Sequence, residues 1–387
     1  MKVKTILLFL GKAVLALVVL ALVFSLVAAD PTTLAPGEPA PDGAPRNPAA
    51  CPVPAEQESL LDVFALAPGR PGWAPLETLW GQQSHRATLV RYLRGGPPVE
   101  QARAALALGL TGEASAREAL AKALTSPDAT VREMAALGLA YLGDERGEAT
   151  ARLTLGRGPD WQRYLALVGL WRLDTAPTRA YLSASPSTAP YPFLGDLMTT
   201  AARTRPWTPA APDTHPPAVY GVPVNTIWEE LADNLVLATD YWWHQGQYEQ
   251  ATYLLQMALF FCPDRVDLYG DVAWLQWSQG RDEMALATLR QGIAANPQDP
   301  LAHFNLGFHY FNTKRFTEAL PFLCTGRECE TWWAPANTYA HCLEVLGKHQ
   351  EAVQAWEETV KRFPTDEPAR RALQRLREAP AAPAATP

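Results

Sequence analysis

The chain repeats itself at fixed periods, and this constrains its fold more than any other feature of the sequence. Gly246 and Pro263 return 34 positions later as Gly280 and Pro297, with Ala and Leu at helical spacing between them. A unit of this length holds two helices and cannot bury its apolar face alone, so neighbouring units have to stack. The sequence therefore predicts an all-α fold built from stacked helix pairs.

A second, slightly shorter period governs the stretch from 100 to 174. The tripeptide Ala-Ala-Leu at 104–106 returns at 135–137, and Gly/Asp turns and Ala-rich second helices follow each copy. This stretch resembles the short HEAT-like repeats, with two clear copies and a third, degenerate one around 161–173. The resemblance implies a helical solenoid module, which we place over 57–183.

The longer units resemble the tetratricopeptide repeat, in which small residues lie where paired helices cross, aromatics wedge between them and a proline closes the second helix. Four units fit this pattern over 225–378, and the resemblance implies a second solenoid module there. The third unit departs from the pattern, because it has Lys314 at the usual glycine and no closing proline near Thr331. Its junction with the fourth unit is one residue short, so we expect an irregular junction.

In the tetratricopeptide family the first helix of each pair lines a concave groove, and the matching positions of this chain are rich in aromatic side chains. The resemblance implies a partner-binding surface made by Val236, Asp240, Trp243, His244, Trp274, Trp277, Phe304, Phe308, Phe311, Asn312, Asn337 and His341. Large rigid side chains bury much area at small entropic cost, which suits a protein or peptide partner. The family's clamp for a chain-terminal carboxylate is not expected, because no Lys or Arg falls at these positions. Alternatively, some of these aromatics pack under the neighbouring repeat or under the linker at 184–224.

Proline accounts for 35 of the 387 residues, but most of it lies in three segments. These are 31–56, 184–224 and 379–387, where Pro is mixed with Ala, Gly and Thr. Such composition favours extended, solvated chain over a packed core. We therefore expect two Pro-rich linkers and a disordered tail, which separate an N-terminal segment, the HEAT-like domain and the tetratricopeptide domain.

The N-terminal segment, residues 1–30, contains a long apolar run. The run extends over 6–29, which is long enough for a helix to span a membrane. Three lysines lie in or before it, and no Lys or Arg follows until Arg46, so the positive-inside rule places the bulk of the chain outside the cytoplasm. We predict a single-pass membrane anchor. The alternative is a cleaved signal peptide, because Val-Ala-Ala at 27–29 suits a signal peptidase.

The charge balance narrows the class of partner. The chain has a net charge of -7, which offers no basic footprint for nucleic acid. Residues 225–378 hold 21 Asp and Glu against 13 Lys and Arg, so this domain accounts for the acidity of the chain. We expect neutral, apolar or basic partners.

The cysteines carry the only further chemistry that the sequence suggests. Outside the cytoplasm, Cys324 and Cys329, or Cys329 and Cys342, are close enough in sequence for a disulfide at the irregular junction. A metal site that adds His341 is not expected, because the spacing matches no known finger. The sequence has no phosphate-loop, nucleophile-elbow or haem-attachment motif. We therefore expect no enzyme activity, no catalytic residue, no metal and no cofactor.

These observations predict a membrane-anchored, extracytoplasmic scaffold or assembly factor that binds a protein partner through an aromatic groove, as part of a membrane or envelope complex. Two alternatives stay open. One is a chaperone-like accessory factor for the maturation of an exported or membrane protein. The other is a glycan or cell-wall binding module, since exposed tryptophans also stack on sugars.

Overall fold

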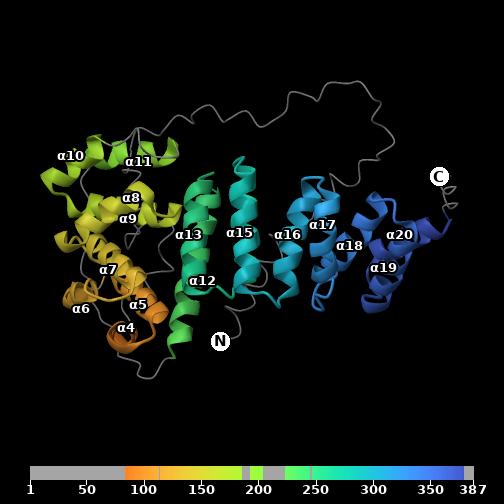
Figure 1. Cartoon of the computed structure of the whole chain (residues 1–387), viewed down its shortest axis with the longest axis horizontal. Helices are drawn as coiled ribbons and strands as arrows, with labels where there is room; N and C mark the ends of the chain where they lie inside the picture. Colours follow the sequence, from red (N-terminus) through yellow and green to blue (C-terminus); the bar gives the residue numbers. More distant parts are fainter. Residues whose placement is uncertain (1–82, 113, 185–191, 204–222, 245, 379–387) are drawn as a thin grey trace. The chain divides into compact units, whose positions relative to one another are not determined.

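Every described element of the protein is a helix or a turn between helices. The computed structural model describes residues 83–112, 114–184, 192–203, 223–244 and 246–378, all within one unit, and contains no strand in these ranges (Figure 1). The prediction of an all-α fold is confirmed.

The predicted membrane segment at 6–29, the linker at 31–56 and the tail at 379–387 lie outside the described residues. Among the helices that the structure does describe, none has the length and apolar character needed to cross a membrane.

The first set of helix pairs follows the shorter period. Its first helices begin at regular intervals and are α5 (Pro98–Leu110), α7 (Ala129–Tyr141) and α9 (Asp160–Leu173). Its second helices are α6 (Arg117–Ala123), α8 (Glu148–Arg157) and α10 (Ala176–Ala184), the first two preceded by short 3-10 turns at Ala114–Ala116 and Glu145–Gly147. Helix α4 (Gln83–Gly95) packs against α5 at the start. The third copy, which the sequence shows as degenerate, is therefore a complete helix pair.

Very short distances between helix backbones characterise this module. A Cβ atom added to Gly109 of α5 would lie 2.3 Å from the Cα of Gly138 in α7. The flanking alanines, including Ala105 and Ala135, are fully buried. Because hydrogen and methyl side chains separate α5 from α7 at this point, the two helix backbones pack closely there.

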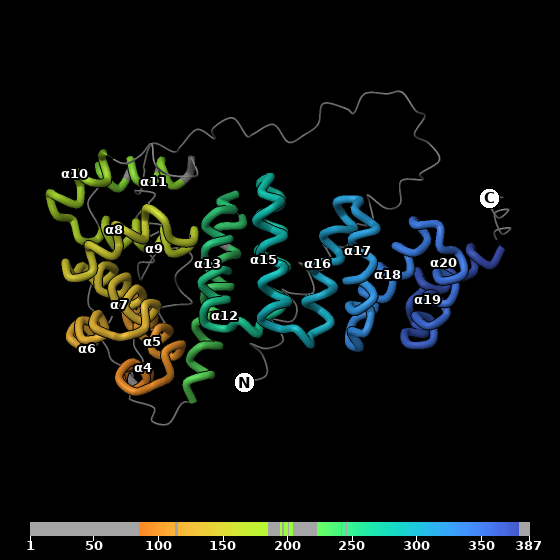
Figure 2. The backbone as a smooth tube through the Cα atoms, viewed as in Figure 1, coloured from red at the N-terminus to blue at the C-terminus, as the bar shows by residue number. Residues whose placement is uncertain are grey.

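The second set of helix pairs follows the longer period. Its first helices are α12 (Val224–His244), α14 (Val266–Ser278), α16 (Pro300–Asn312) and α18 (Ala334–Val345). Its second helices are α13 (Tyr248–Phe261), α15 (Asp282–Ala295), α17 (Phe316–Gly326) and α19 (His349–Arg362), and α20 (Glu367–Glu378) packs on α19 at the end. Neighbouring helices of the chain run side by side, as Figure 2 shows. Helix α19 begins one position earlier than the spacing of α13, α15 and α17 would place it, so the predicted shortfall is present.

The turns inside these pairs use a left-handed backbone. Gly246, Gly280 and Gly347 have φ near 70°, at 70°, 76° and 71°, and Lys314 takes the same place in the third pair with φ 62°. A side chain in this conformation crowds the following carbonyl oxygen, which costs about 1–2 kcal/mol. The third turn therefore keeps the geometry of the other three without the residue that best suits it.

Residues 192–203 differ from the sequence prediction, which placed an extended linker over 184–224. They form helix α11 (Pro192–Arg203). Leu194, Leu197, Met198 and Ala201 are buried in the same core as α9. These four residues follow helical spacing on one face, so the apolar periodicity outweighed the proline-rich surroundings. Residues 204–222 of the predicted linker lie outside the described residues.

The two sets of repeats share one hydrophobic core, which runs from Leu89 to Leu275. At their junction the Trp228 indole Nε1 of α12 donates to a carboxylate oxygen of Glu100 in α5 at 2.6 Å. The rings of Trp161 in α9 and Phe260 in α13 lie 5.3 Å apart. The first helix pair of the second set, α12 and α13, is thus braced by α5 and α9 of the first set.

Candidate functional site

Aromatic contacts join each first helix of the second set to the next. The rings of Trp243 in α12 and Trp274 in α14 lie 5.0 Å apart, and Trp277 in α14 meets the His309 ring of α16 at 6.1 Å. Phe311 in α16 lies 5.6 Å from the His341 ring of α18. We call the predicted surface residues on this path the aromatic row: Trp243, Trp274, Trp277, Phe308, Phe311 and His341. Ring contacts therefore join each of the four helices to the next, with the buried His309 making the contact between α14 and α16.

The aromatic row begins with two tryptophans, Trp243 and Trp274, that pack against the hydrophobic core. Trp243 and Trp274 are half-buried and pack against the shared core, as Val236 does. Trp243 also lies 5.3 Å from the ring of Tyr248. Because each indole keeps part of its surface exposed while the rest is packed, the pair is held in place and is accessible to a partner.

Asp240 and His244 lie beside this pair on α12. Both side chains are exposed, and the His244 ring Nδ1 lies 2.8 Å from the backbone oxygen of Asp240. They add polar groups to the rim of the tryptophan pair.

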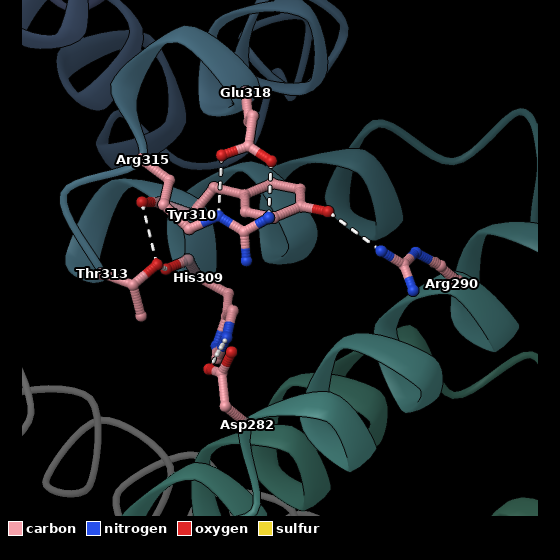
Figure 3. Close-up of polar contacts among 7 residues, drawn as sticks. All are labelled: Asp282, Arg290, His309, Tyr310, Thr313, Arg315 and Glu318. Carbon is pink, nitrogen blue, oxygen red and sulfur yellow. Dashed lines mark hydrogen bonds and ion pairs between the residues drawn. The ribbon is translucent and has the colours of Figure 1, made fainter.

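Trp277 is the most exposed ring of the row, with 38% of its surface accessible. Its neighbour His309 is buried and lies with Nε2 2.8 Å from a carboxylate oxygen of Asp282 in α15. The Thr313 hydroxyl donates to the backbone oxygen of His309 at 2.9 Å (Figure 3). The imidazole that supports Trp277 is therefore fixed by α15, so the indole stands on a rigid base.

The same region is tied together by a second set of polar contacts (Figure 3). The Arg315 guanidinium lies over the Tyr310 ring, 4.5 Å from its centre, and donates to Glu318 at 2.7 Å. Arg290 donates to the Tyr310 hydroxyl at 3.2 Å. Hydrogen bonding from Arg315 lowers the pKa of Glu318 below its usual value. These contacts link α15, α16 and α17 around the turn that contains Lys314.

Phe304 lies below the surface. It is 2% exposed, stacks on Phe308 at 5.2 Å and meets the edge of Trp332 at 5.3 Å. A Cβ atom added to Gly326 of α17 would come within 2.7 Å of the Phe304 backbone, so the second helix closes over it. The sequence prediction placed Phe304 on the partner surface, whereas the structure places it in the core beneath Phe308.

The two predicted asparagines have different environments. Asn312, at the end of α16, is exposed, whereas the Asn337 amide on α18 is half-buried and donates to Asp366 at 2.7 Å. Burial acts to raise the pKa of Glu344, but hydrogen bonds from His341, Trp356 and Arg375 outweigh it, so its pKa is lowered. Asn337 and Glu344 are thus occupied inside the protein.

The structure does not form the predicted disulfide. All four described cysteines are free thiols. Cys342 is buried on α18, where its Sγ lies 3.5 Å from the backbone oxygen of Phe316, and burial raises its pKa to about 11. Cys324 is exposed and Cys329 half-buried, so the three thiols do not share one environment. Within the described ranges no group of three or more His, Cys, Asp or Glu side chains is arranged to hold a metal ion.

Two exposed apolar residues on the first helices of the second set were not predicted from the sequence. Leu237 of α12 and Val345 of α18 are each 45% exposed. Val345 falls at a groove position of the family pattern, so the pattern could have found it. Leu237 falls at none, and only the packing of α12 shows that it is exposed.

Comparisons with known proteins agree with the helix pairs. Residues 87–170 match the family model for HEAT repeats. This part of the chain is similar to HEAT repeats, and we call the first set of helix pairs the HEAT module. Together with the regular spacing of α13, α15 and α17, the match confirms the prediction of HEAT-like and tetratricopeptide-like repeats. No curated protein sequence matches the chain.

Three solved structures illustrate the likeness in fold. The crystal structure of MamA has 18% identity and a TM-score of 0.31, over 36% of this chain and 82% of that one. A thermophilic TPR protein in Thermus thermophilus has 16% identity and a TM-score of 0.32, over 39% and 88% of the two chains. YrrB, described as a TPR protein with an unusual peptide-binding site, has 15% identity and a TM-score of 0.30, over 39% and 81%.

Proposed function

We propose that the protein is a scaffold or assembly factor whose protein partner binds the aromatic row. The observation that carries the proposal is the exposed Trp277 ring, held on His309 and Asp282 within a row that crosses four helices. Partly exposed aromatics on a rigid base are typical of the residues that dominate binding energy at protein interfaces. A solenoid supplies such residues at regular intervals, which suits an extended segment of a partner.

We further propose that the partner belongs to a membrane or envelope complex. The support is the apolar run at 6–29 with lysines on one side only, which favours an anchor that leaves the repeats outside the cytoplasm. Two experiments test this. The chain is expected to stay with the membrane during washing with alkaline carbonate, and a protease added outside intact cells is expected to cleave the repeats. Release by carbonate would contradict anchoring, and protection of the repeats would contradict the orientation.

The test of the binding surface is co-purification of the full-length chain from detergent extracts. The chain is expected to carry a partner in stoichiometric amount, and the double variant Trp277→Ala/Phe308→Ala is expected to lose it. Truncation of a central aromatic at an interface typically costs about 2 kcal/mol, or roughly 30-fold in affinity.

The matched control replaces two exposed apolar residues of the HEAT module, Val99→Ala and Leu153→Ala. These changes remove exposed apolar surface away from the row, so the partner should stay bound. Circular dichroism and melting temperature check that both variants fold. A partner that stays on the Trp277/Phe308 variant, or leaves the control, would contradict the proposal. Capture of many unfolded chains in place of one partner would favour the chaperone-like alternative.

A further inference from the structure

The first helices of the second repeat set differ in charge from the helices behind them. None of α12, α14, α16 and α18 contains a Lys or an Arg. They contain seven acidic residues: Glu229, Glu230, Asp233, Asp240, Asp267, Asp271 and Glu344. The positive side chains of the module lie on the second helices, the turns and α20 instead. Of the helices that carry the aromatic row, α12, α14 and α18 therefore have negative formal charge and α16 has none.

The negative charge is concentrated at one end of the row. Residues 225–300 hold eleven Asp and Glu against three Lys and Arg, whereas residues 301–378 hold ten of each. The first range includes Trp243, Trp274 and Trp277. These three tryptophans and the net negative charge of the module thus belong to the same two repeats.

Part of this acidity is already paired with positive side chains of the chain itself. Arg265 forms ion pairs with Asp233 at 2.9 Å and with Asp267 at 3.0 Å. Glu344 accepts from Trp356 and Arg375. These three carboxylates therefore offer less charge to a partner than a carboxylate without an Arg or Lys beside it.

Asp240 differs from these three carboxylates because no Arg or Lys is paired with it in the described structure. Its side chain is 78% exposed, and its ionic neighbour is His244 at 3.6 Å, itself exposed. Asp240 precedes Trp243 by three residues on α12, as the exposed Asp271 precedes Trp274 on α14. Residues three apart on a helix are neighbours on one face. The two indoles, whose rings lie 5.0 Å apart, are therefore flanked by a carboxylate on each helix.

Indole rings beside carboxylates favour a ligand with positive charge. The face of an indole attracts a cation, and a carboxylate pairs with Lys or Arg. An anionic segment would meet acidic groups and find no Lys or Arg on any first helix. We infer that the partner presents an extended, lysine- or arginine-containing segment, and that its cationic head groups lie at the Trp243–Trp274 pair beside Asp240. This inference rests on the proposed function, since it assigns the partner's chemistry at the same surface.

The test measures binding of three labelled peptides to the full-length chain by fluorescence anisotropy in detergent at fixed ionic strength. Their repeating units are Lys-Leu-Ser, Gln-Leu-Ser and Glu-Leu-Ser, so only the first side chain of each unit differs. The lysine peptide is expected to bind about tenfold more tightly than the glutamine peptide, and the glutamate peptide more weakly than both. Equal affinity for the lysine and glutamine peptides would overturn the inference, and so would no binding of the lysine peptide at about 1 mM.

A matched pair of variants tests whether Asp240 itself binds the lysine peptide or whether the net negative charge of the protein attracts it. Asp240→Asn and Glu283→Gln each remove one exposed carboxylate, but Glu283 lies on the second helix α15. Asp240→Asn should lower affinity for the lysine peptide about three- to fivefold and leave the glutamine peptide unchanged, with little effect from Glu283→Gln. Equal losses in the two variants would show that net charge alone attracts the peptide, and would overturn the assignment.

The proposed function and this inference fail in different ways. If Trp277→Ala weakens all three peptides, the aromatic row is the binding surface, and the order of the peptides then decides the inference. If Trp277→Ala changes none of them, the row is not the surface, and the proposed function fails together with the assignment that depends on it.

Discussion

The two repeat modules are both built from helix pairs, but different side chains lie between their helices. In the HEAT module, α5 and α7 meet backbone to backbone at Gly109 and Gly138, with alanines around them. In the second module, rings such as Phe304 and Phe308 fill the space between helices. In the HEAT module, exposed large apolar side chains such as Val99 and Leu153 are aliphatic. In the second module the packing of rings continues to the surface, because the half-buried Phe308 of the aromatic row stacks on the buried Phe304.

The comparison also explains how the modules cooperate. The HEAT module contributes Glu100 and Trp161 to the junction, where they hold Trp228 and Phe260 of the second module. Helix α12 carries both Trp228 and Trp243, so the brace and the surface belong to one rigid element. We conclude that the HEAT module supports the start of the aromatic row.

The largest expected effect comes from removing a ring that packs the second module. Phe304→Ala should lower the free energy of unfolding by about 3–5 kcal/mol, because it leaves a cavity between α16 and α17 that backbone atoms cannot fill. Phe308→Ala, on the half-buried neighbour, should cost distinctly less. Denaturant unfolding of both variants measures the difference. Equal losses would mean that Phe304 is not the deeper of the two.

The next largest effect on stability is expected from adding one methyl group at the backbone contact of the HEAT module. Gly109→Ala should destabilise by about 2–3 kcal/mol, since the new Cβ would meet the backbone of Gly138, which cannot rotate away. Gly156→Ala is the matched control, because its Cβ would meet open space in α8. It should be neutral or stabilising by up to about 1 kcal/mol. Thermal unfolding compares them, and a harmless Gly109→Ala would contradict the close packing.

The smallest effect concerns the left-handed turns, where the described part of each module has one residue other than glycine. Lys314→Gly should stabilise by about 1 kcal/mol, because it relieves crowding at φ 62°. Asp174 in the HEAT module has φ 48°, and Asp174→Gly should gain less, since Asp tolerates this conformation better than Lys. Melting temperatures would rank the two variants. A larger gain at Asp174 would reverse the expected order.

Repetition made most of the fold predictable from sequence. The helices of each module begin at regular spacings because each turn needs a particular residue, such as Gly143 or Gly280, at a fixed place. Even Lys314 could be identified as a departure from the usual glycine, although its turn keeps the left-handed backbone of the others. Local periodicity carries this information, so it does not depend on distant contacts.

Other features depend on contacts between distant residues, and the sequence alone does not reveal them. Phe304 occupies a groove position of the family pattern, but the close approach of Gly326 and the edge of Trp332 enclose it. The packing of α11 into the core and the contact between Glu100 and Trp228 involve residues far apart in the chain. Likewise, sequence proximity allowed a disulfide for Cys342, whereas in the structure this residue is a buried free thiol.

The central claim is that a partner binds the first helices of the second module while the HEAT module supports them. Amide hydrogen exchange of the full-length chain, with and without its co-purified partner, tests this most directly. Binding is expected to slow exchange in α14 and α16, with unchanged exchange in α5 and α7. Slower exchange confined to α5, α7 or α9 would place the partner on the HEAT module and would contradict the account.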